Sequence, residues 1–327
     1  MKPKERPNAK LNQQESNFQH SDNNQLKSSK QTRKNLRVSW IKYVFIALLF
    51  SVGLSIFLYP PISDFINEQS QTSIVDSYKE AIKKLSEEEK NYSLEQARAY
   101  NRSLLGRQTA LADPFTSNQE YEDAVVSFLN VGEVIGYIEI PRIHVTLPIY
   151  GETSEAVLQK GVGWLSGTSL PVGGESTHTV LTGHRGLPTS RLFTDIHKLA
   201  IGDEFFLRNH SGILAYQVFE VRIIEPHDIA ALEIIAGEDR ATLLTCHPFM
   251  INSHRLLVMG KRVEYTGQLE KEVFNKSLLE TLSPTETRFT IAVFVALILI
   301  CLFALLVRRS RKKQASKSLK QRSNKQQ

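Results

Sequence analysis

Residues 242–262 read TLLTCHPFMINSHRLLVMGKR. They contain two apolar runs of the length and composition typical of strands, one ending at Cys246 and the other beginning at Arg255. A His-Pro step stops the first run, and residues 251–254 (Ile-Asn-Ser-His), mostly polar, form a turn before the second. If that turn closes a hairpin, Arg255 returns along the neighbouring strand to lie beside Cys246.

A strand pattern extends through the region before this hairpin. From position 134 apolar residues alternate with others, with prolines interspersed, at Ile138, Ile140, Val145, Leu147 and Ile149. Further strand candidates are 179–181, 204–207, 214–224, 240–245 and 255–263. Many short strands with few helices predict a mainly β fold, a closed or nearly closed structure of about 135 residues. We place this domain at 131–266.

The charge of the chain lies in its two ends. Residues 1–42 carry a net +7 and residues 308–327 a net +9, whereas the remainder carries −10, within a total of +6. A nucleic-acid-binding face is therefore not expected, since the body of the protein is acidic. The chain has only two cysteines, which excludes a disulfide-stapled scaffold.

Each basic end adjoins an apolar run long enough to cross a bilayer. Residues 43–59 and 289–307 carry no charge, and the first predicted span is 40–59. The first run could be a secretory signal, but Tyr-Pro-Pro follows it in place of a cleavage site, which favours an uncleaved signal anchor. Basic flanks stay on the cytoplasmic side, so the tails 1–39 and 308–327 are expected inside and residues 60–288 outside. The tails are polar and are not expected to fold.

Residues 60–130 form the predicted helical segment of the exterior part. Two sets of apolar residues recur at helical spacing between 64 and 106, and the acidic stretch 86–90 between them is expected to be a solvated face. These apolar positions are Val75, Tyr78, Ile82 and Leu85, then Leu94, Ala97, Tyr100 and Leu104. A loop is predicted at 111–117, and a juxtamembrane linker at 267–288.

Cys246 is the single cysteine outside the predicted spans, because Cys301 lies in the second one. Most free cysteines are buried small hydrophobes, which is the plain alternative for this one. A thiol with a pKa of about 8.5 becomes a good nucleophile only beside a cationic group. Arg255 suits that role and that of an oxyanion donor, although most arginines merely form surface ion pairs.

His184 is the candidate acid–base group. It follows the strand candidate 179–181 and lies between two glycines, which suits a side chain presented from a loop. The rival histidines His178, His247 and His254 fit structural or solvated positions better. A zinc site built from these histidines and Cys246 is disfavoured because no metal-type spacing such as His-x-x-x-His occurs.

Three segments together resemble the sortases. TLLTCHPFMINSHRLLVMGKR (242–262) resembles their catalytic strand pair, HTVLTGHRGLP (178–188) their histidine motif, and IGYIEIPRIHVTLPIY (135–150) their first strands. The resemblance covers about 131–264 in the expected order. It implies an eight-stranded β-barrel with N-terminal helices and two transmembrane helices.

The resemblance also implies roles for individual residues. Cys246 would be the nucleophile, His184 the general acid and base, and Arg255 the group that binds the oxyanion or positions the substrate. The sequence Asp113-Pro114-Phe115 is similar to the lid of class C, pilus-associated sortases. There Asp113 would lie near Arg255 and Phe115 over Cys246.

Such enzymes are cysteine transpeptidases of Gram-positive cell surfaces. The family would cleave an LPxTG-like sorting signal between Thr and Gly and join the acyl group to a lysine of a pilin subunit, with no cofactor. The alternatives are a housekeeping sortase that anchors proteins to the cell wall and an inactive two-span receptor or assembly scaffold. Two departures from the family pattern are His247, where a small polar residue is expected, and Met259, where many relatives have Arg.

Overall fold

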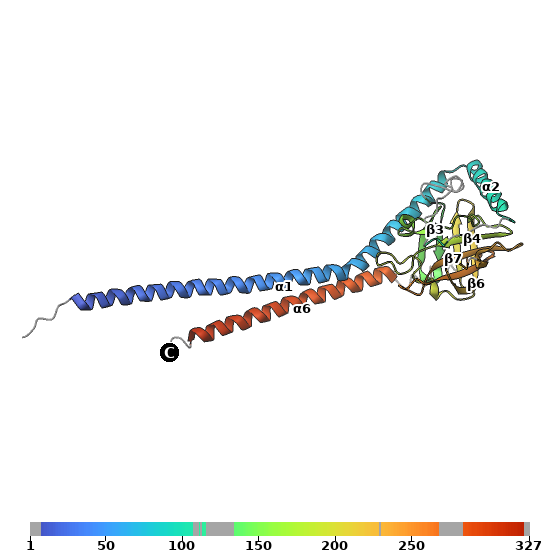
Figure 1. Cartoon of the computed structure of the whole chain (residues 1–327). Coiled ribbons are helices and arrows are strands. Elements are labelled where there is room, and N and C mark those ends of the chain that lie inside the picture. Colours follow the sequence, from blue (N-terminus) through green and yellow to red (C-terminus); the bar gives the residue numbers. More distant parts are fainter. Residues whose placement is uncertain are drawn as a thin grey trace, which may run out of the picture. The chain divides into compact units, whose positions relative to one another are not determined.

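A computed structural model describes residues 8–106, 111, 113–115, 134–228, 230–267 and 284–323. These residues form two units, one comprising the segments up to Leu58 and from Phe294 onward, the other Tyr59–Val293. The second unit contains a closed barrel with helices packed on it (Figure 1). Most of the predicted linker at 267–288, and residues 116–130 of the predicted helical segment, lie outside the described residues.

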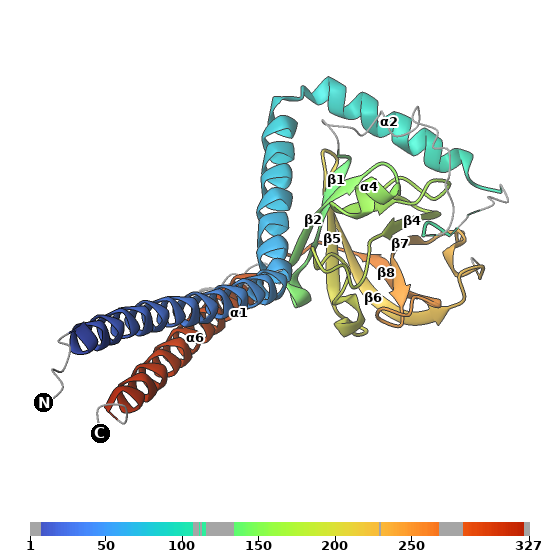
Figure 2. The same cartoon turned by 60° about the vertical axis from the view of Figure 1, so that its left-hand side comes forward.

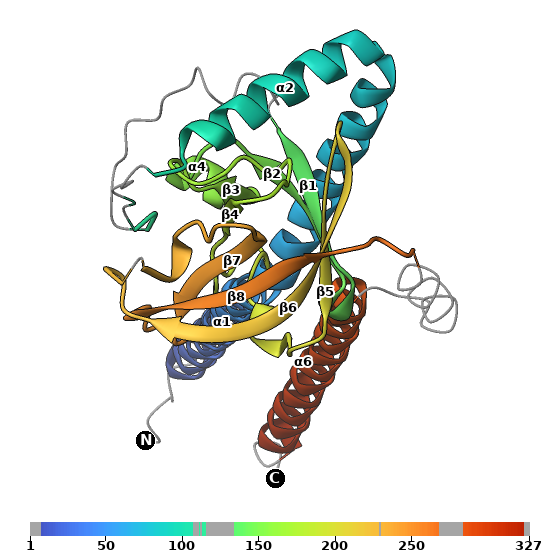
Figure 3. The same ribbon diagram turned by 90° about the vertical axis from the view of Figure 1, so that its right-hand side faces the viewer.

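Eight strands close the barrel, which confirms the expectation from the family resemblance, and their order is β1-β2-β3-β4-β7-β8-β6-β5 (Figure 3). Their bounds are β1 Gly136–Ile140, β2 Val145–Tyr150, β3 Val162–Trp164, β4 Thr177–Thr182, β5 Glu204–Asn209, β6 Gly212–Ile224, β7 Asp239–His247 and β8 His254–Val263. Short helical turns lie between them: η1 Pro141–Ile143, α4 Glu155–Leu158, η2 Ile196–Lys198 and η3 Ala230–Leu232. The β2–β3 and β4–β7 pairs are parallel, and all other neighbours are antiparallel.

Side chains of β1 point alternately into the barrel and away from it. Ile138 and Ile140 lie fully buried in the main apolar core, together with Trp164 and Phe205. Tyr137 points to the opposite face, yet it is also buried. This strand is therefore covered on both sides, so its outer face needs a partner from elsewhere in the chain.

Helix α1 (Asn8–Lys84) supplies that cover with its C-terminal part. Val75 and Tyr78 lie in one buried cluster with Tyr137 and Tyr150, and the rings of Tyr78 and Tyr137 meet edge to face at 6.3 Å. The Tyr78 hydroxyl donates a hydrogen bond of 3.1 Å to the backbone oxygen of Ile135.

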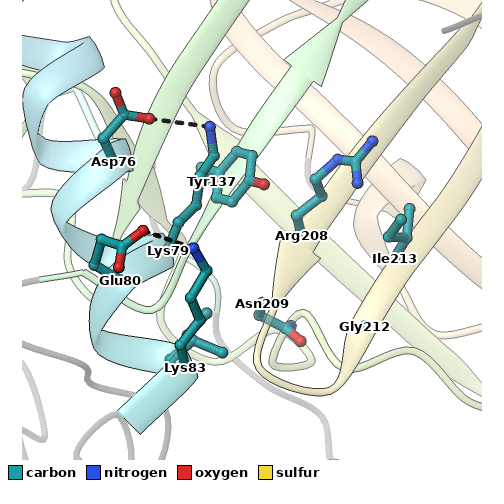
Figure 4. Close-up of a pocket in the computed structure, with 10 residues that line it drawn as sticks. Asp76, Lys79, Glu80, Lys83, Tyr137, Arg208, Asn209, Gly212 and Ile213 are labelled. Carbon is teal, nitrogen blue, oxygen red and sulfur yellow. Dashed lines mark hydrogen bonds and ion pairs between the residues drawn. The ribbon is translucent and has the colours of Figure 1, made fainter.

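At the rim of this contact, polar groups face solvent. Figure 4 shows Lys79 beside the ring of Tyr137, with Asp76 paired to Lys79 along the helix. The apolar spacing that predicted this helix thus marks the face that packs on the barrel.

Helix α2 (Glu87–Ser103) lies across one end of the barrel (Figure 2). Tyr100 packs edge to face on Trp164, and the buried Asn101 both donates to and accepts from the backbone of Leu170. The helix begins at a capping box formed by Ser86 and Glu89. The acidic stretch 86–90, expected to be a solvated face, is therefore also the start signal of a helix.

The unit outside the barrel consists of helical segments. Within α1, which continues into the barrel unit at Tyr59, the stretch Phe45–Lys84 is long and apolar enough to cross a membrane. Helix α6 (Pro284–Ser323) contains a shorter apolar stretch, Phe289–Leu305. Within this unit the rings of Phe50 and Phe303 stack at 4.5 Å.

The terminal segments differ from the sequence expectation of unfolded tails. Both helices continue into the polar tails, with α1 beginning at Asn8 and α6 ending at Ser323. The tails are rich in Lys, Gln and Arg, which favour helix once the apolar segment has nucleated one.

Candidate active site

The β7–β8 hairpin brings the predicted thiol and guanidinium together. Cys246 and Arg255 are direct partners in the antiparallel pair, and β7 ends at His247, before Pro248. Residues 248–253 make the connection, in which the backbone N–H groups of Ile251 and Asn252 both donate to the oxygen of Pro248. The hairpin predicted from the sequence is confirmed.

The parallel pairing of β4 with β7 places His184 on the other side of Cys246. Thr182 is paired with Leu244 at the end of β4. One residue further on, the Gly183 N–H donates to the oxygen of Leu244 (3.1 Å), and the Thr245 hydroxyl donates to the oxygen of Gly183 (2.7 Å). His184 therefore follows at the level of Cys246.

Gly183 is needed here because a Cβ atom at this position would lie 2.8 Å from the ring of Phe193. The glycine before the histidine thus allows the chain to leave β4 against the core, which explains this part of the motif.

The His184 ring has a carboxylate partner that the sequence did not reveal. Its Nε2 lies 3.1 Å from Oε2 of Glu155, the first residue of α4, and its side chain is 17% exposed. A carboxylate at this distance can fix the orientation of an imidazole ring. No motif connects the two residues, which lie 29 positions apart and meet only through the barrel.

Asp113 holds Arg255 through a two-point ion pair. The Arg255 Nε and Nη2 groups donate to the two Asp113 oxygens at 2.7 and 2.6 Å, with both side chains buried. The Nη1 group donates to the backbone oxygens of Asn252 and His254, both at 2.9 Å. In this arrangement Arg255 is neutralised by the predicted lid residue.

Phe115 covers the site beside this ion pair. Its ring centroid lies 5.4 Å from that of His184 and 5.2 Å from the guanidinium carbon of Arg255, and Pro114 is buried. The expected position of this ring was over Cys246. The ring instead contacts His184, in the loop after β4, and Arg255, on β8, which flank Cys246.

Cys246 is 6% exposed, and burial raises the pKa of its thiol. Arg255 and Arg185 act in the opposite direction and lower that pKa, whereas Asp113 raises it. With the lid in place, the thiol is therefore shielded both from solvent and from part of the positive charge of Arg255.

Two further residues, Arg185 and His247, pair at the edge of the site. Nη1 of Arg185 donates to Nδ1 of His247 at 3.0 Å, which requires that nitrogen to be unprotonated. Burial and the charge of Arg185 lower the pKa of His247. The unexpected histidine after Cys246 is thus the partner of the arginine after His184.

His178 has a structural position, as expected. It is fully buried, with Nδ1 2.9 Å from the backbone oxygen of Glu233 and Nε2 2.7 Å from the Thr242 hydroxyl. Burial lowers its pKa to about 4, so it is neutral at physiological pH. Met259, the other departure from the family pattern, is buried in an apolar cluster with Leu257.

Residues 138–263 match the family model described as the Sortase domain. Sortase D of Bacillus subtilis (strain 168) is 30% identical over 135 residues, which is 40% of this chain and 65% of that protein. Sortase A of Bacillus anthracis is also 30% identical over 135 residues, 41% of this chain and 62% of its own length. The chain thus spans less than two thirds of these two curated relatives.

Solved structures extend the similarity beyond the barrel. Sortase C1 of GBS Pilus Island 1 has 49% identity and a TM-score of 0.57, covering 61% of this chain and 94% of that one. Sortase C of Streptococcus pneumoniae has 46% identity and a TM-score of 0.57, covering 59% and 97%. At this identity and coverage, the chain belongs to the sortase family of cysteine transpeptidases.

Proposed function

We propose that this protein is a membrane-anchored class C sortase that polymerises pilins. The observation that carries the proposal is that Cys246 pairs with Arg255 in the β7–β8 hairpin while His184 follows the end of β4, the strand on the other side of β7. Asp113 is bonded to Arg255 at two points. The pilus-related sortases among the similar structures support the class.

Cys246 is proposed to be the nucleophile. Its thiolate attacks the carbonyl carbon of the Thr–Gly bond in an LPxTG-like sorting signal. The C–N bond then breaks, and the glycine amine leaves with a proton supplied by the His184 imidazolium. The product is a thioester between Cys246 and the threonine of the substrate. Glu155 would help to hold the imidazolium in place.

The second half of the reaction reverses these proton movements. A lysine amine of another pilin subunit attacks the thioester carbonyl and gives up a proton to His184. The C–S bond breaks, Cys246 departs as a thiolate, and an isopeptide bond joins the two subunits. Exclusion of water would favour this aminolysis over hydrolysis.

Arg255 is proposed to bind the oxygen that becomes negative during each attack. Its Nε and Nη2 donors are bonded to Asp113, and its Nη1 group is bonded to two backbone oxygens. A substrate oxyanion must therefore take the place of the Asp113 carboxylate. The lid, Asp113-Pro114-Phe115, would have to move before the reaction begins.

The proposed topology is a hairpin with two spans and both termini in the cytoplasm. The uncharged run 289–307, its basic flank and the stacking of Phe50 on Phe303 support a second span in α6. The barrel then lies outside the cell. Tags at the two termini should resist protease added to intact protoplasts; cleavage of the C-terminal tag would contradict the second span.

Intact-mass analysis of the full chain with a pilin bearing its sorting signal tests the chemistry. We expect a mass increase equal to the pilin cut after Thr, absent from Cys246→Ala. Cys246→Ser is the matched control for packing, because it preserves the shape of the residue but removes the thiol. An adduct in Cys246→Ala would refute the proposed nucleophile.

The same experiment separates the alternatives. A housekeeping sortase would transfer the acyl group to a cell-wall peptide amine, so the acceptor in the linked product distinguishes it from a pilin polymerase. An inactive receptor or scaffold would give no adduct in any variant, and Cys246 would resist thiol reagents even without the lid.

A further inference from the structure

Next to the site, the β7–β8 loop presents three consecutive apolar side chains to solvent. Phe249, Met250 and Ile251 are 49%, 68% and 70% exposed, and we refer to Phe249–Ile251 as the apolar tip. They follow Cys246 by three to five positions. Large apolar side chains that are contiguous and exposed usually mark a contact surface.

The loop that carries the apolar tip has a constrained backbone. Met250 has φ of 66°, in the left-handed region that a long side chain rarely adopts. The bonds from Ile251 and Asn252 to the oxygen of Pro248 close the loop around it. A backbone held in an unfavourable region is typical of sites where the presented group has a function.

The apolar tip lies beside the part of α1 that follows the apolar run. A cavity of about 300 Å³ is lined by Phe249, by Leu187 of the loop after His184, and by Pro60 and Pro61. The ring of Phe249 also lies 3.1 Å from where a Cβ of Gly186 would be. Since the uncharged run ends at Tyr59, Pro60 and Pro61 come directly after its end.

Hydrogen bonds fix the loop after His184 to the same part of α1. Asp64 accepts from the Arg191 N–H at 3.0 Å, and Asn67 donates to the Thr189 oxygen at 2.7 Å. Gln71 donates to the Ser190 hydroxyl at 3.1 Å. These helix positions lie 5 to 12 residues beyond Tyr59, which is at most about 8–18 Å along a helix.

We infer that the apolar tip inserts into the surface of the lipid bilayer in which α1 is anchored. The chain's own connectivity places Pro60 and Pro61 at the boundary of the apolar segment, and the cavity they share with Phe249 brings the tip to that boundary. Aromatic and aliphatic side chains gain free energy by entering the headgroup region. The reactive thiol is thereby held close to the lipid surface.

The inference rests on the membrane anchoring of α1 and is independent of the chemistry at Cys246. Its consequence is that the site receives substrates presented at the membrane. A pilin or another protein as the occupant of the tip is the competing possibility, and lipid-only particles distinguish the two.

Tryptophan quenching by brominated lipid tests the contact. The full chain carrying Trp40→Phe is placed in nanodiscs, with Met250→Trp, Ile251→Trp or, as a control, Tyr92→Trp. Tyr92 is equally exposed, at 65%, but lies on α2, which begins after the far end of α1. Trp164 is 1% exposed in the barrel and gives a constant background.

We expect brominated acyl chains to reduce the added emission at positions 250 and 251 roughly two-fold or more, with little change at position 92. The chain with native Trp40, the first residue of the predicted span 40–59, reports separately on anchoring. If Trp40 is quenched while positions 250 and 251 behave like position 92, the inference is overturned although the anchoring holds, and the tip belongs to a protein partner.

Discussion

Two segments that precede the barrel in the sequence cover it in different ways. Helix α1 covers β1 through an apolar cluster in which Val75 and Tyr78 pack against Tyr137. The lid covers the site through the ion pair of Asp113 with Arg255, helped by the ring of Phe115. One cover excludes water from apolar surface, and the other neutralises a charge.

The two kinds of contact differ in what is lost when they open. Opening the α1 contact exposes apolar surface to water, which costs about 25 cal/mol of free energy per Å². No new favourable interaction offsets this cost. Opening the lid returns two charges to water, which recovers most of their attraction as hydration. A substrate anion can therefore displace the lid, whereas α1 stays packed on the barrel.

The largest expected effect is on stability, when the contact between α1 and the barrel is weakened. Tyr78→Ala removes a ring that is 2% exposed, together with its hydrogen bond to Ile135. We expect a loss of about 3–5 kcal/mol in the free energy of unfolding. In thermal denaturation of the full chain, this corresponds to a melting temperature lower by about 10 °C.

Tyr92→Ala is the matched control, because Tyr92 is a helical tyrosine that is 65% exposed. It should leave the melting temperature nearly unchanged. Asp113→Ala should also cost much less than Tyr78→Ala, since water can reach Arg255 once the lid is free. A loss for Asp113→Ala as large as for Tyr78→Ala would remove the distinction between the two covers.

The cover by α1 could be predicted from sequence, and the cover by the lid could not. Helical spacing of Val75 and Tyr78 marks a buried face without any knowledge of the partner strand. Taken alone, Asp113-Pro114 is only a turn opener, and its partner Arg255 lies 142 positions away. The contact was expected only because the segment resembles a family in which it occurs.

Other parts of the fold show the same limit. The predicted strands agree with the structure to within a few positions, but β3 (Val162–Trp164) was missed because its three residues include a central glycine and show no strand pattern. The hairpin register that joins Cys246 to Arg255 followed from turn length. The approach of Glu155 to His184 depends on how β2, β3 and β4 meet in the closed barrel, which local patterns do not encode.

The second prediction concerns the lid, Asp113-Pro114-Phe115. In a Cys301→Ser background, Asp113→Ala with Phe115→Ala should speed alkylation of Cys246 about ten-fold or more. A ten-fold gain corresponds to about 1.4 kcal/mol held in the closed lid. The rate is measured by quenching the alkylation at set times and determining the modified fraction by mass spectrometry. The variant Tyr78→Ala shows whether a loss of stability alone can raise the alkylation rate. Equal rates with and without the lid residues would mean that this loop does not gate the thiol.

The smallest expected effect distinguishes the influence of the Asp113 charge on Cys246 from that of solvent access. Asp113 raises the pKa of the Cys246 thiol and Arg255 lowers it, so Asp113→Asn should move the midpoint of the alkylation pH profile downward. Phe115→Leu changes no charge, so it should raise the rate at all pH values and move the midpoint less than Asp113→Asn does. If both variants shift the midpoint equally, solvent access rather than the Asp113 charge controls the thiol, and the lid would act on Cys246 in the same way as α1 acts on β1, by excluding water.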